Sequence, residues 1–295
     1  MMNVAKTIEE IRRFVRRGRG AGKTIGLVPT MGALHEGHLS LIDAARKACD
    51  LAVVSIFVNP TQFGPAEDLS RYPRTPEADL ALCRRRGVDA VFMPSVEEIY
   101  PRTDMAEAGQ SLTEVSVSKL SQTLCGRSRP GHFTGVCTVV AKLFNIVQPD
   151  KAFFGAKDFQ QAAIIRRLTA DLDFPVEIVL CPTVREGDGL AMSSRNAHLT
   201  PSQRKGAPAL YGALRLAEQM IRESRPPAEA VISAMRQYLA THAPEGIVDY
   251  IQIVDPDSLA DVVSTISRVL VALAVKLGST RLIDNMVVDA RPSKA

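Results

Sequence analysis

Two histidines at a strand-to-helix junction are the first residues in this chain whose types and spacing suggest chemistry. His35 and His38 lie three residues apart, so on one helical turn both imidazoles would face the same ligand. The junction also carries Gly32 and Gly37, where a ligand can approach the backbone N–H groups that open a helix and attract phosphate. Residues 28–40 therefore favour a nucleotide site, with a solvated helix cap or a stray metal site as the alternatives.

Two further turns carry residues suited to holding phosphate. Residues 155–158 read Gly-Ala-Lys-Asp and follow a short apolar run, and residues 193–195 read Ser-Ser-Arg within a polar, glycine-bearing stretch. Nucleotidyl transfer is catalysed mostly by positioning and by neutralising developing negative charge, which cationic side chains and hydroxyl donors supply. Each piece alone is common in loops, but two of them follow strands and the third lies where the domains meet, and together they predict that all three bind the phosphates of one ATP.

A regular alternation of apolar strands and amphipathic helices predicts the scaffold for these turns. The fold class expected is α/β, with a Rossmann-like doubly wound parallel sheet and a smaller C-terminal α+β domain. Such sheets bind ligands at the carboxyl ends of their strands. Asn59 and Gln62 emerge at one such end, where they would either meet substrate or satisfy turn backbone. The predicted strands are residues 24–28, 51–58, 88–93, 151–154 and 176–181.

The pattern changes near residue 185, which divides the predicted domains into residues 1–184 and residues 185–295. A capping box at residues 200–203 is expected to open a long helix toward Arg222, and a second helix is expected to end near His242. Three strand-like runs follow, and Gly278-Ser279 between the last two suggests a tight hairpin. We expect the C-terminal domain to act as a lid.

Composition and charge favour a small-molecule enzyme over a nucleic-acid or membrane protein. The chain has 295 residues, 46% hydrophobic residues and a net charge of +4, with no long apolar span for a bilayer. Residues 12–23 are rich in arginine, but their one aromatic residue, Phe14, falls on the apolar side of the predicted helix. No aromatic stacking platform accompanies the cluster, which favours a solvated helix face. The five scattered cysteines lack a C-x-x-C pair and fit a reducing cytoplasm.

Seven segments together resemble the pantoate–β-alanine ligase (pantothenate synthetase) family, a branch of the nucleotidyltransferase superfamily that includes class I aminoacyl-tRNA synthetases. Residues 29–38, Pro-Thr-Met-Gly-Ala-Leu-His-Glu-Gly-His, match the family's version of the superfamily "HIGH" signature. The resemblance runs from about residue 4 to the C-terminal strands. The other matching segments are residues 54–63, 71–74, 129–133, 154–161, 192–196 and 281–285.

The resemblance implies an ATP-dependent, AMP-forming ligation of (R)-pantoate and β-alanine on the route to coenzyme A. Pantoate would attack ATP to give pantoyl adenylate and pyrophosphate, and β-alanine would then displace AMP to give pantothenate. It also implies Mg²⁺ carried in on ATP, a cytoplasmic homodimer, and neither nucleic acid nor a membrane as partner. A related enzyme that adenylates a phosphate monoester is the alternative, but neutral Gln62 and Gln161 suit a hydroxy acid better than a phosphate.

The resemblance also assigns the site residues. Six residues are implied as catalytic: His38, His35, Lys157, Ser193, Ser194 and Arg195. ATP would contact Met31, Gly32, Ala33, Leu34, His35, Glu36, Gly37, His38, Gly155, Ala156, Lys157, Asp158, Val184, Met192, Ser193, Ser194 and Arg195. Pantoate would contact Gln62, Gln161, Asn59 and Arg129, and β-alanine would contact Gln62.

Two positions depart from common patterns, and the metal ligands stay open. Ala156 stands where the family commonly has Glu, but its backbone can still serve. Arg195 replaces the lysine of the wider superfamily, which is usual in this family and counts against a tRNA synthetase. Asp68, Asp79 and Asp158 are equal candidates for binding Mg²⁺.

Overall fold

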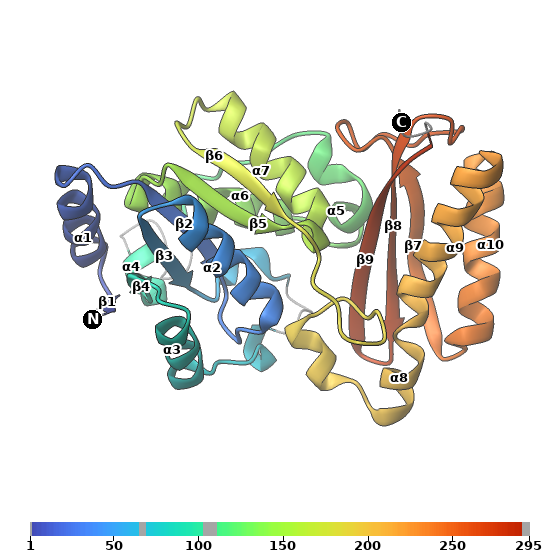
Figure 1. Cartoon of the computed structure of the whole chain (residues 1–295), viewed down its shortest axis with the longest axis horizontal. Helices are drawn as coiled ribbons and strands as arrows, with labels where there is room; N and C mark the ends of the chain where they lie inside the picture. Colours follow the sequence, from blue (N-terminus) through green and yellow to red (C-terminus); the bar gives the residue numbers. More distant parts are fainter. Residues whose placement is uncertain (1, 65–68, 103–110, 291–295) are drawn as a thin grey trace. The chain divides into compact units, whose positions relative to one another are not determined.

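The computed structural model describes residues 2–64, 69–102 and 111–290, and these form two compact units, unit 1 and unit 2 (Figure 1). Unit 1 consists of Met1–Ser121, Arg129–Ala156 and Ile164–Pro182. Unit 2 consists of Gln122–Ser128, Lys157–Ala163 and Thr183–Ala295. Two short segments from the first 184 residues therefore belong to unit 2, and one of them begins at Lys157.

Unit 1 is built on a six-stranded sheet in the order β1-β4-β3-β2-β5-β6, and each neighbouring pair is parallel. The sequence predicts every strand except the short first one, whose three residues are too few to carry a periodic signal. The order runs outward in both directions from β2 and β5, so the predicted doubly wound parallel sheet is confirmed. The strands are β1 (Asn3–Ala5), β2 (Ile25–Thr30), β3 (Leu51–Ile56), β4 (Ala90–Phe92), β5 (Lys151–Gly155) and β6 (Glu177–Cys181).

The strand order reverses between β2 and β5, and these two strands separate toward their carboxyl ends. β2 pairs with β3 along its whole length, from Ile25 to Thr30. Its pairing with β5 covers only Gly26 and Leu27, although both strands continue. A crevice at such a reversal is where open α/β sheets bind ligands, because the connections leave in opposite directions.

Helix α2 (Glu36–Ala48) lies directly after β2 and is fixed to the sheet by its apolar face. Leu39, Ile42 and Ala45 recur at helical spacing and pack in one core cluster with the strand residues Val28 and Val54. Burying each large side chain is worth about 1.5–3 kcal/mol, so the start of α2 is rigidly placed. Other helices with residues in unit 1 are α1 (Ile8–Gly20), α3 (Pro76–Arg85), α4 (Val96–Ile99), α6 (His132–Val147) and α7 (Phe159–Asp171).

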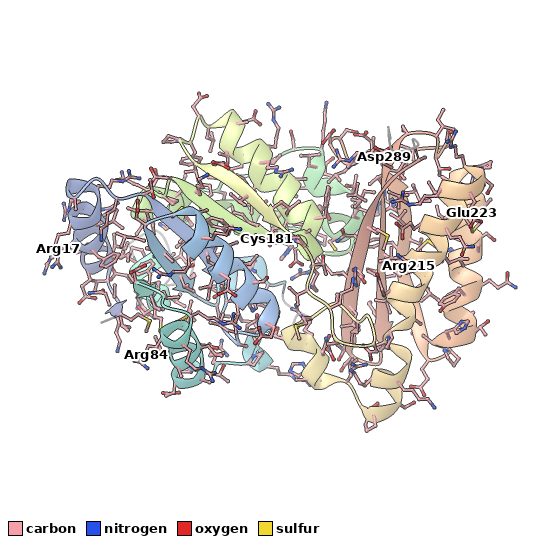
Figure 2. All side chains as sticks on the ribbon, in the orientation of Figure 1. Arg17, Arg84, Cys181, Arg215, Glu223 and Asp289 are labelled. Carbon is pink, nitrogen blue, oxygen red and sulfur yellow. The ribbon has the colours of Figure 1, made fainter. Side chains whose placement is uncertain are left out.

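The arginine-rich helix α1 is amphipathic, as its sequence suggests. Ile11 and Val15 are buried, whereas Arg12, Arg16 and Arg17 are exposed. Figure 2 shows Arg17 projecting outward from the ribbon. The charge cluster is thus the solvent face of a packed helix. No helix in the described part of the chain is long and apolar enough to cross a membrane.

Unit 2 contains an antiparallel sheet in the order β7-β8-β9, with a core cluster shared by the sheet and two helices. The predicted hairpin is confirmed, because Leu277 pairs with Thr280 and Gly278 has a φ of +59°. The elements are α5 (Leu124–Ser128), the short 3₁₀ helix η5 (Ser194–His198), α8 (Pro201–Gly206), α9 (Ala209–Ser224), α10 (Ala228–His242), β7 (Gly246–Val254), β8 (Arg268–Leu277) and β9 (Thr280–Asp289).

The prediction of one long helix after residue 200 is wrong, because two helices, α8 and α9, cover this stretch. The capping box is present, because Thr200 Oγ1 accepts the N–H of Gln203, but α8 ends at Gly206 and α9 begins at Ala209. Pro208 lies at the break. Its ring removes a backbone donor and clashes with the carbonyl four residues earlier, so the helical pattern cannot run through it.

Candidate active site

The turn that follows β2 is held open by a buried carboxylate. Asp79, on α3, is 2% exposed and accepts the backbone N–H groups of Ala33 at 2.9 Å and Leu34 at 2.8 Å. Thr75 donates its hydroxyl to the same carboxylate at 3.2 Å. Charge-assisted bonds to backbone N–H groups are about twice as strong as neutral ones. Asp79 therefore fixes the path of the chain between β2 and α2.

Gly32 is required by the geometry of this turn. It has a φ of +81°, and Ala33 after it has a φ of +50°. A Cβ added at Gly32 would lie 2.9 Å from Oδ2 of Asp79 and 3.0 Å from Ile56. Both the left-handed conformation and the close approach of the carboxylate therefore exclude a larger side chain.

The two histidines cap helix α2 in place of the usual Ser or Thr and Glu. Nδ1 of His35 accepts the N–H of Gly37 at 3.1 Å, and Nδ1 of His38 accepts the N–H of His35 at 3.3 Å. Backbone N–H groups only donate, so each neutral imidazole carries its proton on Nε2. The two rings lie with centroids 4.1 Å apart. The predicted shared face of His35 and His38 is thus present, and each ring is oriented by a backbone bond.

A buried amide cluster lies after β3, where Asn59 and Gln62 were predicted to emerge. Nδ2 of Asn59 donates to Oε1 of Gln62 and to the carbonyl of Gly135, each at 3.1 Å. Oδ1 of Asn59 accepts the hydroxyls of Thr61 and Tyr100, each at 3.0 Å. These four bonds use the full hydrogen-bonding capacity of the Asn59 amide, which is 1% exposed.

The Asn59 cluster orients Gln62. Because Oε1 of Gln62 accepts from Asn59, its amide nitrogen points the other way and lies 3.1 Å from Sδ of Met31. Burial raises the pKa of the Tyr100 phenol, so Tyr100 stays a protonated donor to Asn59. His132 binds the carbonyl of Gln62 through Nδ1 at 2.8 Å.

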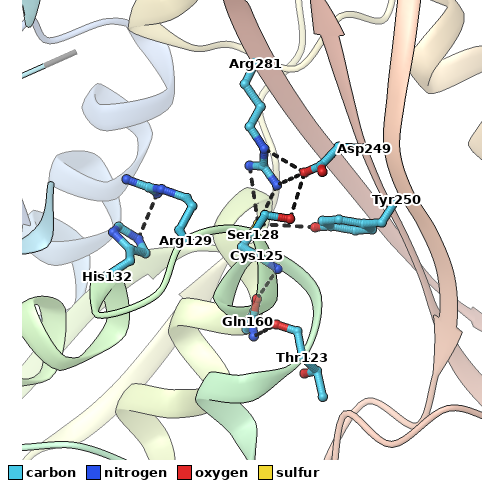
Figure 3. A network of polar contacts seen from close by, with 9 residues as sticks. All are labelled: Thr123, Cys125, Ser128, Arg129, His132, Gln160, Asp249, Tyr250 and Arg281. Atoms are coloured by element: carbon cyan, nitrogen blue, oxygen red, sulfur yellow. Dashed lines mark hydrogen bonds and ion pairs between the residues drawn. The ribbon is translucent and has the colours of Figure 1, made fainter. Parts of the chain in front are cut away.

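Arg129 joins the same part of unit 1. Its guanidinium lies 3.0 Å from Nε2 of His132 (Figure 3), so Arg129, His132 and Gln62 form one chain of polar contacts. His132 contacts both of these predicted site residues, and sequence reasoning did not single it out. The signal was present, because His132 belongs to residues 129–133, one of the family segments.

The Lys157 turn belongs to unit 2. Residues Ala156–Asp158 form a 3₁₀ turn between β5 and α7, and the Lys157 ammonium lies 3.6 Å from the carboxylate of Asp158. The carbonyl of Lys157 accepts the side-chain amide of Asn285 on β9 at 2.7 Å. The lysine side chain is 20% exposed, so its aliphatic stem is largely covered.

The Ser-Ser-Arg segment is also in unit 2 and is fixed at both ends. Ser193 caps η5 by accepting the N–H of Arg195 at 3.3 Å. Asn196 donates to the carboxylate of Glu186 at 2.7 Å and to the carbonyl of Ala191 at 3.1 Å. The segment therefore starts from a defined hairpin at residues 185–191, and η5 packs against β9.

A family model for pantoate–β-alanine ligases matches residues 3–287. The chain belongs to the pantoate–β-alanine ligase family. It is similar to the pantothenate synthetase of Moorella thermoacetica, with 54% identity over 288 residues that cover 98% of this chain and 99% of the relative. The pantothenate synthetase of Acetivibrio thermocellus is 50% identical over 288 residues, which cover 98% of this chain and 100% of the relative.

Solved structures of ligases in this family share the fold. Pantothenate synthetase from Thermus thermophilus has a TM-score of 0.90 and 43% identity, with 99% of this chain and 100% of that chain covered. Pantoate–β-alanine ligase from Francisella tularensis, complexed with beta-gamma ATP and beta-alanine, has a TM-score of 0.79 and 34% identity. It covers 97% of this chain and 98% of its own.

The residues predicted for the ligase site fall into two groups, one in each unit. Unit 1 holds the predicted residues from Met31 to His38 together with Asn59, Gln62, Arg129, Gly155 and Ala156. Unit 2 holds Lys157, Asp158, Gln161, Val184, Met192, Ser193, Ser194 and Arg195. Glu36 lies on the outer side of α2, where its carboxylate pairs with Arg86 at 2.9 Å.

The described residues offer no ready-made metal cage. Across residues 2–64, 69–102 and 111–290, no group of three or more His, Cys, Asp and Glu side chains could hold a metal ion. Asp79, one of the three metal candidates, uses both carboxylate oxygens on the turn. Asp158 faces Lys157, and Asp68 lies outside the described residues.

Proposed function

We propose that this chain joins (R)-pantoate and β-alanine to give pantothenate, with ATP converted to AMP and pyrophosphate through a pantoyl adenylate. The observation that carries the proposal is the pair of backbone-anchored imidazoles at the start of α2, which directs two Nε2–H donors from a helix N-terminus. Family membership over residues 3–287 supports the choice of substrates.

In the first step, a pantoate carboxylate oxygen attacks the α-phosphorus of ATP. The new O–P bond forms as the bond to pyrophosphate breaks, and negative charge builds on the departing phosphates. His35 and His38 stabilise this charge as hydrogen-bond donors, and Lys157 and Arg195 do so as cations. Pyrophosphate needs little protonation as a leaving group when it is neutralised in this way, so we assign His38 an electrostatic role.

In the second step, the β-alanine amine attacks the acyl carbon of pantoyl adenylate. The C–N bond forms, the amine gives up a proton, and the C–O bond to AMP breaks. Adenylation makes this step possible, because a free carboxylate is a poor acylating agent whereas AMP is a good leaving group. We assign Gln62 to both pantoate and β-alanine, and Gln161 to pantoate.

The pantoate pocket combines ligands with residues that orient them. The amide of Asn59 is saturated by protein contacts, so we propose that it contributes by turning the Gln62 amide toward the substrate. Arg129 contributes a positive charge opposite the pantoate carboxylate. Met31, in contact with Gln62, borders the same pocket and the ATP-binding turn.

Mg²⁺ would enter bound to the ATP phosphates. Because the described residues lack a cluster of three or more ligating side chains, the triphosphate and water would supply most of its ligands, as is common for this ion. When bound, the ion neutralises phosphate charge. Asp158 is the remaining candidate among the described carboxylates for contact with it.

The proposal includes an oligomeric state and a cellular location. The family resemblance implies a homodimer, which sedimentation analysis of the purified chain tests. A cytoplasmic location is supported by the five cysteines, all of which are unpaired and buried.

Isotope exchange and product analysis test the proposed reaction. We expect radioactive pyrophosphate to exchange into ATP when pantoate is present and β-alanine is absent, because the adenylate forms reversibly. With all three substrates, AMP and pantothenate should accumulate in equal amounts. Formation of ADP would contradict the adenylate mechanism, and exchange that depends on a phosphate monoester would favour the related nucleotidyltransferase.

A further inference from the structure

Three polar side chains of strand β9 each bind a segment of unit 2 that is distant in the sequence. These side chains are Arg281, Asp284 and Asn285, which belong to the family segment at residues 281–285. The ligase reaction gives none of them a role in contacting substrate. Their partners are β7 and α5 for Arg281, the hairpin at residues 185–191 for Asp284, and the Lys157 turn for Asn285.

Arg281 binds a partly buried polar network (Figure 3). Its guanidinium donates twice to Asp249 on β7, at 3.0 and 2.7 Å, and lies 3.6 Å from Sγ of Cys125 on α5. Burial raises the pKa of Asp249, but hydrogen bonds from Arg281 and Ser128 outweigh it and hold that pKa below its usual value. Asp249 is therefore a charged partner at neutral pH.

The same network reaches the start of α7, three residues beyond Lys157. Gln160 accepts the N–H of Cys125 at 3.0 Å and donates to the carbonyl of Thr123 at 2.8 Å. Sγ of Cys125 lies 3.2 Å from the hydroxyl of Tyr250. Figure 3 shows Cys125 in contact with both Gln160 and Tyr250. The Lys157 turn is thus followed by a helix whose first turn is bound to the unit 2 framework.

Asp284 fixes the hairpin that leads into the Ser-Ser-Arg segment. Its carboxylate forms a two-pronged pair with Arg185, at 2.6 and 3.0 Å, with the Asp284 side chain 2% exposed. Arg185 also donates to the carbonyl of Gly189 at 3.1 Å and stacks over the ring of Tyr211. Such a bidentate pair fixes orientation as well as position.

Asn285 holds Lys157 through the backbone. Its amide nitrogen donates to the Lys157 carbonyl at 2.7 Å, while its own backbone N–H donates to Oδ1 of Asp284 at 2.8 Å. Two consecutive residues of one strand therefore bind the Lys157 turn and the hairpin that leads to the segment of Arg195. A shift in β9 would be transmitted to both segments.

We propose that Asp284 and Asn285 are positioning residues for adenylation, with Asn285 placing Lys157 and Asp284 placing residues 192–195 through Arg185. This inference rests on the proposed ligase reaction. Lys157 and Arg195 neutralise charge that leaves with pyrophosphate, so their placement affects the first step. The second step proceeds after pyrophosphate has gone and depends on it much less.

Two near-isosteric variants of Asn285 test the proposal. Asn285→Asp replaces the donor by an oxygen that repels the Lys157 carbonyl, and Asn285→Leu removes the donor without adding charge. We expect both to slow pantoate-dependent pyrophosphate exchange by about 10-fold or more, since small misplacements of catalytic groups have effects of this size. With chemically prepared pantoyl adenylate and β-alanine, the rate should stay within about twofold of the parent enzyme.

A matched control tests whether an added negative charge alone, away from Lys157, slows the exchange. Asn145→Asp makes the same substitution on the exposed side of α6, and its exchange rate should equal that of the parent. If both half-reactions of the Asn285 variants fall by the same factor, Asn285 is merely structural and the proposal is overturned. Unchanged exchange in the variants also overturns it.

The test distinguishes this proposal from the ligase assignment itself. If the parent enzyme shows no pantoate-dependent exchange, the proposed function fails, and the inference falls with it. If the parent exchanges normally and the Asn285 variants do too, only the inference fails. Asp284→Asn, with folding checked by circular dichroism, should give the same split between half-reactions, because the neutral amide no longer orients Arg185.

Discussion

The two regions that we propose to bind phosphate are positioned in different ways. In the His35–His38 turn of unit 1, the capping bonds join residues two and three apart in the sequence. In unit 2, Lys157 is bound by a residue 128 positions away, and Arg185 by one 99 positions away. The first region is largely a local structure placed at a strand end, whereas the second exists only when distant segments fold together.

This difference separates two ways of building a binding site. A strand, a glycine turn and a helix start are specified mainly by neighbouring residues, and Asp79 adds a long-range anchor for the turn. The unit 2 segments have weak local preferences and depend on side chains of one strand. We therefore expect changes in the turn to act through backbone strain, and changes in unit 2 to act through lost long-range bonds.

The largest effects should come from removing one charge-stabilising group in each region. His38→Ala and Lys157→Ala should each slow adenylation by about 100- to 1000-fold, as seen when one preorganised donor is lost. Pantoate-dependent pyrophosphate exchange measures the step directly. Near-normal exchange in both variants would contradict the site assignment, and a normal rate in one alone would show that only the other region takes part.

Strain in the turn should have the next largest effect, and three glycines allow it to be dissected. Gly32→Ala combines a left-handed φ of +81° with a clash against Asp79, so it should lower stability by about 1–3 kcal/mol. Gly22 has a φ of +71° but open space around it, so Gly22→Ala should lower stability by less than Gly32→Ala. Gly20 has neither a left-handed φ nor a close neighbour, so Gly20→Ala should leave stability nearly unchanged. Urea denaturation gives the three values, and equal costs at Gly32 and Gly22 would mean that Asp79 yields without penalty.

A smaller effect is expected from the amide cluster of unit 1. Tyr100→Phe removes one of the two hydroxyls that saturate Oδ1 of Asn59, at a cost of about 1 kcal/mol. If Asn59 orients Gln62, this should appear as a KM for pantoate raised by about fivefold, with KM for ATP unchanged. Tyr238→Phe on α10 is the matched control. If Tyr100→Phe changed KM for pantoate and KM for ATP equally, this would argue against a specific role of the cluster in pantoate binding.

The smallest effect concerns an exposed ion pair in unit 2. Hydrogen bonding to Arg204 lowers the pKa of Asp188, so the charged form is favoured in the folded state. Its contribution is present above the unfolded pKa of about 3.9 and is lost as pH falls through the lower folded value. Asp188→Asn should therefore cost less than about 1 kcal/mol at neutral pH and nothing in strong acid. A cost that persists in acid would indicate a role for shape rather than charge.

Local patterns predicted most elements of both units, including the three strands and the hairpin of unit 2. The parallel strands and the capping histidines follow from apolar periodicity and the Gly32–His38 spacing, because each depends on neighbouring residues. The expected long helix fails at Pro208, where a ring that lacks a donor outweighs a helical pattern. Asp79 was expected only as a metal candidate, since nothing in its helix indicates that it accepts backbone N–H groups of a distant turn.

The sequence by itself determined which groups are available for chemistry: the two imidazoles at a helix start, the lysine after β5, the Ser-Ser-Arg segment and the polar residues of β9. Their chemical types and short-range spacing are written in the chain. Only the tertiary structure decided that Asp79 binds the turn before the imidazoles and that Asn59 orients Gln62. It also decided that Asp284 binds Arg185 and that Asn285 binds the Lys157 carbonyl. Those bonds join residues that come together only after the strands are paired and the core is buried. Local sequence patterns therefore cannot predict them.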